Sequence, residues 1–538
     1  MNRKTRALIA LTLTLSMLCG CSSPAVSAWI QKLYPAADET VAAQQAEGVN
    51  TQKTEQTLTA VVTETYQALE SFGLAYQPDY GLQPYNCRSL NNRVIFSFLY
   101  EPLFAVTNTY ELTPILAERY TVTDDGRTTT ITLRSGVTFH DGSAFTAADA
   151  AYSIQCAAGS EYYGSRLRFI VSAEAQDDRT LVLTTSESYE CLPLLLDIPI
   201  IKNSSAEETC PPGTGPYQYG GTKLTRFAGW WQDAEPLVSF DEIALTESTT
   251  SADVRDNFEY QKVNMVLTDP NSSAFAGFHN DYELWNEETT IMQYIGYNMN
   301  SSVFSNYGLR GAITYAIDRE MLVEQTFGGF AAASTLPCSP SSRYYDVKLA
   351  NSFAYDVGSY YDQLASASIE DATGDGVLDV YVPSKGYSVP VEGTMLVCSS
   401  SYIRVQAANE VARMLNDLGF NITVKSMEYT EYKQALLLGD FDLYYGEVRL
   451  SPNFDLSPFF GATGTLNYGD LSDSTMMNLC SMALVNSGNT YNLYKRVCER
   501  GYITPILFKS YALYTTRGAV TEPAQYIDWF LPYTPEAE

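Results

Sequence analysis

Polar side chains follow each of three predicted strands in the second half of the chain. They are Ser399–Ser401, Glu428 and the segment from Glu447 to Asp455. In doubly wound parallel sheets, ligands bind outside the carboxyl ends of the strands, so we expect these segments to line a binding cleft. Arg449 adds a positive charge there, and serines at a helix N-terminus also favour an anion. The chemistry predicted is recognition of a charged solute, in particular of a ligand carboxylate.

Arg449 also has a purely structural interpretation. Buried arginines are usually paired, so its guanidinium could pair with Glu447 or Asp455 and contact no ligand. The sequence supports the two interpretations about equally. The candidate ligand-binding residues of this region are Arg449, Glu447, Ser451, Phe454, Asp455, Ser399 and Ser400.

The elements that must position these residues alternate along the chain. An apolar strand at 394–398 precedes a helix whose apolar residues recur at 3.6-residue spacing and which ends at Gly419. A strand at 422–424, a helix at 430–438 and a strand at 441–446 follow. This strand–helix–strand–helix–strand order predicts a parallel, doubly wound α/β sheet.

Residues suited to catalysis are scarce. The whole sequence has two histidines, His140 and His279, and no HExxH, GxSxG or GxxxxGK[ST] motif. His140 lies in Phe139-His140-Asp141-Gly142, where a structural role is expected. We therefore predict no enzyme activity, no cofactor and no metal site, although a metal could still bind through its own chelator.

Length, charge and cysteine usage indicate an exported protein with an acidic surface. The 538 residues predict two or three domains. They include 62 acidic and 33 basic residues, and the net charge of −29 repels nucleic acid and anionic lipid. None of the ten cysteines forms a CxxC pair, and Cys480/Cys498 and Cys191/Cys210 are candidate disulfides by their closeness in sequence.

The N-terminus has the features of an export signal. Basic residues precede the apolar run Ala7–Leu18, which is too short to span a bilayer. Leu18-Cys19-Gly20-Cys21 resembles a bacterial lipobox, so residues 1–21 are predicted to be a lipoprotein signal peptide and Cys21 the lipidated residue. Residues 22–65 are predicted to be a flexible tether. We expect an exported protein, lipid-anchored on the outer face of the cytoplasmic membrane.

Ordered motifs give the sequence a family resemblance. Leu99-Tyr100-Glu101-Pro102-Leu103-Phe104 comes first, and Phe139-His140-Asp141-Gly142 precedes a helix that Thr146 and Asp149 are predicted to cap. Gly213-Thr214-Gly215-Pro216-Tyr217 and a helical segment at 309–320 follow. Together they closely resemble the extracellular solute-binding proteins of the oligopeptide, dipeptide and nickel class, which are the capture subunits of ABC importers.

The resemblance implies a two-lobed α/β fold of the periplasmic-binding-protein type (type II, cluster C-like) with a small insert subdomain. Lobe I is expected to be discontinuous, at 66–105, 206–300 and 503–538, with the insert at 106–205 and lobe II at 301–502. We expect lobe II to have a sheet of its own. Hinge motion would close the lobes around a solute.

The resemblance also implies a function. The protein is expected to be a membrane-tethered monomer that delivers peptides, or a related small solute, to an ABC permease and its ATPase subunits. Tyr85 and Asn86 lie in a loop that borders the cleft in the family, and Trp230 could stack on a ligand; turn chemistry and interdomain packing are the structural alternatives. Alternative cargoes are a metal chelate or haem, and an alternative role is that of a chemosensory or adhesin-like receptor.

The predicted binding loop departs from the pattern of peptide binders. In those relatives it begins with Trp and carries an Asp that pairs with the α-ammonium group of the peptide. This sequence has Val448 and Ser451 at the two positions. Glu447 or Asp455 could take over the ammonium contact after a small shift of the loop, so a peptide stays the expected cargo.

Overall fold

The computed structural model describes residues 69–234, 237–272, 277–279, 281–520, 524–527 and 529–533. The predicted signal peptide with Cys21 and the predicted tether at 22–65 lie outside these residues. Every element described below belongs to one compact unit within residues 66–538. Within the described part, no helix has the length and apolar character that a membrane crossing requires.

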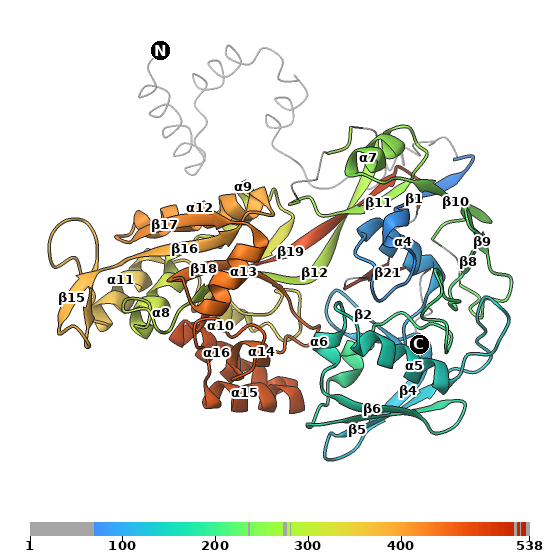
Figure 1. Cartoon of the computed structure of the whole chain (residues 1–538), viewed down its shortest axis with the longest axis horizontal. Coiled ribbons are helices and arrows are strands. Elements are labelled where there is room, and N and C mark those ends of the chain that lie inside the picture. The colour runs from blue at the N-terminus through green and yellow to red at the C-terminus, as the bar shows by residue number, and fades with distance from the viewer. Residues whose placement is uncertain are drawn as a thin grey trace, which may run out of the picture. The chain divides into compact units, whose positions relative to one another are not determined.

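The first lobe forms one end of a large sheet (Figure 1). Its central strand β1 (Phe72–Tyr76) pairs in parallel with β10 (Glu242–Glu247) and β11 (Met265–Thr268). Antiparallel strands β9 (Lys223–Arg226) and β8 (Tyr217–Tyr219) complete the edge. Helix α4 (Leu90–Leu99) packs against β1 and β11, and α7 (Ser251–Glu259) packs against β11.

The segment expected as the insert contains a separate antiparallel sheet with the order β4-β5-β7-β6. Helix α5 (Ala147–Ala158) packs against β6 and β7, and the capping box that Thr146 and Asp149 were predicted to form is present at its start. The other elements of this segment are β2 (Phe104–Val106), β3 (Leu112–Pro114), β4 (Ala117–Val122), β5 (Thr128–Leu133), α6 (Gly164–Leu167), β6 (Ile170–Ala175) and β7 (Thr180–Thr185).

The second lobe confirms the alternation predicted for residues 394–446. Its parallel strands β16 (Glu392–Cys398), β17 (Asn421–Met427) and β18 (Leu443–Arg449) have the order β17-β16-β18 and are connected by α12 (Tyr402–Asn416) and α13 (Tyr429–Leu438). Strand β18 runs three residues past the predicted end at 446, so Glu447 and Arg449 belong to the strand itself. The remaining elements are α8 (Tyr307–Ala316), α9 (Arg319–Gln325), α10 (Val347–Asn351), α11 (Val357–Ser366), β14 (Asp379–Val382), β15 (Tyr387–Pro390), α14 (Ser457–Phe460), α15 (Ser474–Val485) and α16 (Thr490–Arg500).

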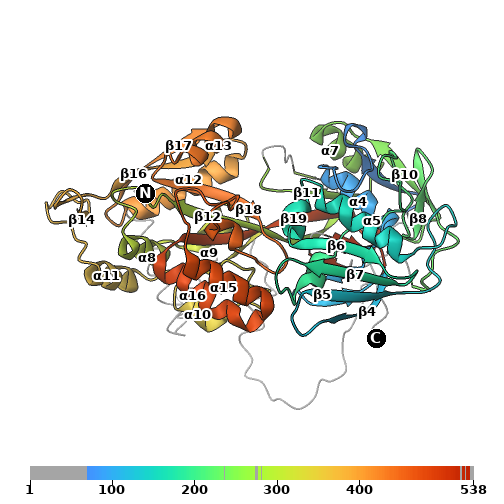
Figure 2. The ribbon, with the colours of Figure 1, turned by 60° about the horizontal axis from the view of Figure 1, so that its bottom comes forward.

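Two long antiparallel strands, β12 (Tyr282–Tyr297) and β19 (Ile503–Thr516), run from one lobe to the other (Figures 1 and 2). β12 pairs with β18, and β19 pairs with β11 and with β13 (Ala331–Ala333). The expectation of a separate sheet for lobe II is therefore wrong: one hydrogen-bonded sheet extends from β17 to β8, because these two strands are long enough to join both halves. The division at 300/301 and 502/503 stays a prediction, and the pairing places residues 291–297 beside β18 of the second lobe.

The described residues form several apolar cores, and one of them crosses from the insert segment into lobe II. One core gathers Phe72 of the first lobe with Ile131 of the insert, and another gathers Val411 and Leu443 of the second lobe. A third core includes both Tyr110 of the insert segment and lobe II residues such as Phe459. The insert segment and lobe II are therefore packed directly against each other.

Candidate ligand-binding site

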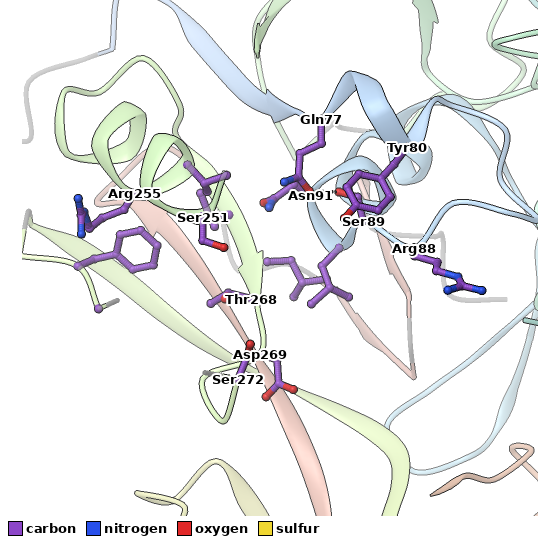
Figure 3. A pocket seen from close by; sticks show the side chains of 16 residues that line it. Gln77, Tyr80, Arg88, Ser89, Asn91, Ser251, Arg255, Thr268, Asp269 and Ser272 are labelled. Carbon is purple, nitrogen blue, oxygen red and sulfur yellow. Dashed lines mark hydrogen bonds between the residues drawn. The ribbon is translucent and has the colours of Figure 1, made fainter. Parts of the chain in front are cut away.

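A pocket of about 320 Å³ lies in the first lobe beside the carboxyl ends of β1 and β11. Its polar lining includes Gln77 and Tyr80 after β1, Asp269 after β11, and Ser251 and Arg255 from α7 (Figure 3). The first turn of α4 also borders it. β1 and β11 are parallel to each other, and the pocket lies at their carboxyl ends. The cleft of lobe II was predicted from the same position relative to its parallel strands.

Asp269 connects this pocket to the crossing strands β12 and β19, which run from one lobe to the other. Its carboxylate lies 2.6 Å from the ammonium of Lys509 on β19, and Lys509 Nζ lies 3.4 Å from Glu447 Oε2 on β18. Burial opposes the charged form of Lys509, but Glu447 and Asp269 outweigh it and raise its pKa. One buried cation therefore links an acid of the first lobe to an acid of the second.

Glu447 is held by two more groups. Arg404 of α12 pairs with its Oε1 at 2.6 Å, and Gln293 Nε2 on β12 donates to its Oε2 at 2.8 Å. Burial raises the pKa of Glu447, but Lys509 and Arg404 more than compensate, so its pKa lies below the ordinary value. The carboxylate is ionised and neutralised within the protein, and a ligand ammonium group would have to compete with these cations for it.

Arg449 contacts aromatic side chains from two other parts of the fold. Its Nη2 donates to the hydroxyl of Tyr511 on β19 at 2.9 Å, and its guanidinium lies 5.3 Å from the ring centroid of Tyr162 in the insert. Arg93 of α4 lies 4.3 Å from the same ring centroid. Glu447 pairs with Arg404, and Asp455 pairs with Arg168. Two guanidinium groups around one tyrosine make this a favourable place for an anion.

The loop after β18 contacts the insert. Ser451 Oγ donates to Asn453 Oδ1 at 2.7 Å, within the loop. Phe454 is 1% exposed and packs against Tyr110, with 4.9 Å between ring centroids. Asp455 forms an ion pair with Arg168 of the insert. This part of the predicted cleft is an interface between lobe II and the insert.

The serines after β16 occupy three different positions. Ser399 Oγ donates to Glu428 Oε1 at 3.0 Å, which brings together two of the strand ends singled out in the sequence. Ser400 is exposed and lies 3.2 Å from Cys398 Sγ. Ser401 caps α12 and also donates to the carbonyl of Asn271 in the first lobe at 3.1 Å. Ser401 is therefore the serine that joins the lobes.

Tyr85, Asn86 and Trp230 each donate a hydrogen bond to another group of the protein. Tyr85 is 2% exposed and donates to the carbonyl of Pro199 at 2.7 Å. Asn86 is exposed in a turn, where its backbone N–H donates to Gln83 Oε1 at 3.0 Å. Trp230 Nε1 donates to the buried carboxylate of Glu101 at 3.3 Å.

The candidate disulfides do not form. The eight cysteines of the described part of the chain are free, and Cys210 and Cys498 contact Tyr100 and the carbonyl of Thr335 instead. His140 is enclosed in the fold, where its Nδ1 accepts from the N–H of Gly213 and its Nε2 lies 3.1 Å from the carbonyl of Gly215. Among the described residues, no group of His, Cys, Asp and Glu side chains could hold a metal ion.

Sequence reasoning missed the partners that complete the site. They are Asp269, Arg404, Lys509, Tyr511 and Tyr162. A lysine in the otherwise apolar strand Ile503-Thr504-Pro505-Ile506-Leu507-Phe508-Lys509 was a signal, because a buried lysine requires acidic partners. The identity of those partners depends on the strand register, which the sequence does not give.

Comparison with known proteins gives a family model and curated sequences that this chain resembles. A model of the family described as bacterial extracellular solute-binding proteins, family 5 Middle, matches residues 111–467. The glutathione-binding protein GsiB of Salmonella typhi is 30% identical over 282 residues, which are 49% of this chain and 55% of GsiB. The chain thus spans about half the length of the curated relatives it matches.

Solved structures resemble the fold over most of the chain. The oligopeptide-binding protein AppA of Bacillus subtilis, in complex with a nonapeptide, is 20% identical with a TM-score of 0.57 and covers 83% of this chain and 94% of its own. NikA of Brucella suis, in complex with Fe(III)-EDTA, is 18% identical with a TM-score of 0.66 and covers 86% and 98%. At these identities the likeness shows the fold, which is the two-lobed architecture of periplasmic binding proteins.

Proposed function

Because this chain belongs to family 5 of the bacterial extracellular solute-binding proteins, we propose that it captures a small solute at the two crossing strands and delivers it to an ABC permease. The family is one of solute-binding proteins rather than enzymes. The observation that carries the proposal is the position of Lys509, which joins Asp269 of the first lobe to Glu447 of the second. Charged groups of both lobes meet where a solute must be held if hinge motion encloses it.

A peptide or a related zwitterion is the cargo that the site favours. Arg449 and Arg93, whose guanidinium groups both lie near the Tyr162 ring, suit a carboxylate, and the proteins that this chain resembles include a glutathione-binding protein and an oligopeptide-binding protein in complex with a nonapeptide. A metal chelate is a second candidate, because NikA was solved with Fe(III)-EDTA. Either cargo would present carboxylates to Arg449.

The remaining features of the proposal are the oligomeric state, the domain boundaries and the membrane anchor. We infer a monomer with lobe I at 66–105, 206–300 and 503–538, an insert at 106–205 and lobe II at 301–502. Cys21 would carry a lipid that holds the protein on the outer face of the cytoplasmic membrane. A chemosensory or adhesin-like role on the same fold would retain solute binding but not the permease partner.

A solute screen with a matched pair of variants tests the proposal. Thermal shift with di- to pentapeptides, glutathione and metal chelates identifies a solute, and titration calorimetry then measures its affinity. Arg449→Ala is expected to weaken binding by about 1.5–3 kcal/mol, the range for hydrogen bonds to charged groups. Arg413→Ala, which removes an exposed arginine on α12 that pairs with Glu410 and Asp417, is the control and should bind like the wild type. Equal affinity of all three proteins would refute a role for Arg449.

A further inference from the structure

The crossing strands present several ionisable groups on one face of the sheet. Lys509 and Tyr511 are two residues apart on β19, so their side chains point to the same face. Lys509 contacts Glu447, and Tyr511 contacts Arg449, which places those residues of β18 on this face too. Glu287 of β12 is the residue directly opposite Tyr511 in the antiparallel register, and opposed residues share a face.

Glu287 differs from the other acids of this face. Asp269 pairs with Lys509, and Glu447 pairs with Lys509 and Arg404. Glu287 is 7% exposed, and its Oε1 is shielded from solvent with no hydrogen-bond partner. A buried carboxyl oxygen without a partner costs free energy that an apolar side chain at the same position would not.

The protonation equilibrium of Glu287 suits a ligand cation. Burial raises its pKa to about 7, so the carboxyl is protonated much more readily near neutral pH than an exposed glutamate is. A cation placed beside it would favour the charged form and supply the missing partner. Arg449 of β18 donates to the hydroxyl of the same Tyr511, so an acid and a guanidinium lie close to one tyrosine.

We propose that Glu287 receives the cationic amine of the solute while Arg449 receives its carboxylate, which makes the cargo a zwitterion with a free amino group. This inference rests on the proposed function and adds to it the residue that contacts the amine of the solute. It also assigns the ammonium contact to β12 rather than to the loop after β18, whose acid Asp455 is already paired with Arg168.

The test compares Glu287→Gln with Glu288→Gln, its neighbour on the opposite face, where the carboxylate contacts Ser341. Both variants and the wild type are screened by thermal shift against glutathione, tri-alanine, their N-acetylated forms, and dicarboxylates without an amine. Hits are titrated by calorimetry. We expect wild-type hits only among solutes with a free amine, a loss of about 10- to 100-fold in affinity for Glu287→Gln, and less than twofold for Glu288→Gln.

The melting temperature without solute separates this role from a structural one. Glu287→Gln removes a buried ionisable group, so its melting temperature at pH 8 should equal or exceed that of the wild type while its affinity falls. Hits that bind Glu287→Gln as tightly as the wild type, or N-acetylated peptides that bind as tightly as free ones, would overturn the inference alone. If no solute in this screen or in the co-purified material binds the wild type, the proposed function fails and this inference fails with it.

Discussion

Asn453 of the loop after β18 donates a 2.6 Å hydrogen bond to the hydroxyl of Tyr189 in the insert. Both side chains are buried. Asp455, two residues further on, pairs with Arg168 of the same insert, and Phe454 packs on Tyr110 between them. The loop that the sequence assigned to ligand contact therefore joins lobe II to the insert.

Arg168→Gln tests the energetic weight of this junction. The Asp455 side chain is 2% exposed and would lose its counter-ion, whereas the Arg168 side chain is 36% exposed and would be partly solvated in any case. We expect a loss of about 1–3 kcal/mol in the free energy of unfolding, less than for a fully buried pair. Urea denaturation measures it. Arg119→Gln, at an exposed pair with Glu118, is the control with an effect near zero, and equal stabilities of the two variants would contradict the prediction.

His140 should make stability depend on pH. Burial lowers its pKa to about 4, whereas the unfolded chain binds the proton near 6.5. Because the folded state resists this protonation, His140 does not lower the free energy of unfolding above pH 6.5. As the pH falls toward 4, the free energy of unfolding decreases by about 3 kcal/mol in total. Unfolding of the wild type and His140→Gln at pH 8 and 4.5 isolates this effect, with His279→Gln, an exposed histidine, as the control. A His140→Gln variant with the wild-type pH dependence would show that His140 does not titrate in this way.

The buried carboxylate of Glu101 binds Trp230 and the adjacent Trp231. Its carboxylate is fully buried and accepts hydrogen bonds from Thr214, Trp230, Trp231, Gln232 and Tyr533. Burial raises the pKa of Glu101, and these donors oppose that rise. In Glu101→Gln an NH₂ group faces hydrogen-bond donors, so we expect the free energy of unfolding to fall by at least about 2 kcal/mol. Chemical denaturation measures this loss, and Glu174→Gln, at an exposed glutamate, is the control. Equal stability of the two variants would exclude this role of Glu101.

The lipid anchor is tested at Cys21. In a bacterial host labelled with a clickable fatty acid, the wild type and Cys19→Ala should carry the label and fractionate with the membrane. Cys21→Ala should lose the label and remain unprocessed. Labelling of Cys21→Ala at the wild-type level would exclude Cys21 as the modified residue.

Local order and periodicity predicted much of the fold. The strands and helices between 394 and 446 and the Thr146–Asp149 capping box depend on neighbours in sequence, and the structure contains them. The continuous sheet was not predicted, because it depends on β12 and β19, which are separated by about 200 residues and pair only in the folded state.

Only part of the candidate site could be predicted, because the rest depends on pairing between strands that are distant in sequence. Arg449 and Glu447 could be found from the carboxyl end of a predicted strand, and both lie at the crossing strands. Their partners Tyr511 and Lys509 come from a distant strand whose register no local pattern fixes. Phe454 and Asp455 follow the same strand but turn away to the insert, because Phe454 has φ 52° and redirects the chain.

The central claim, that this chain holds a small solute at the crossing strands, is tested most directly by native mass spectrometry of the full-length protein purified from its native cell envelope without denaturation. The protein is expected to carry a single non-covalent adduct of defined mass that is released on denaturation and is depleted in Arg449→Ala but retained in Arg413→Ala. The bare mass of the protein in every preparation, together with no thermal shift by any solute of the screen, would contradict the claim.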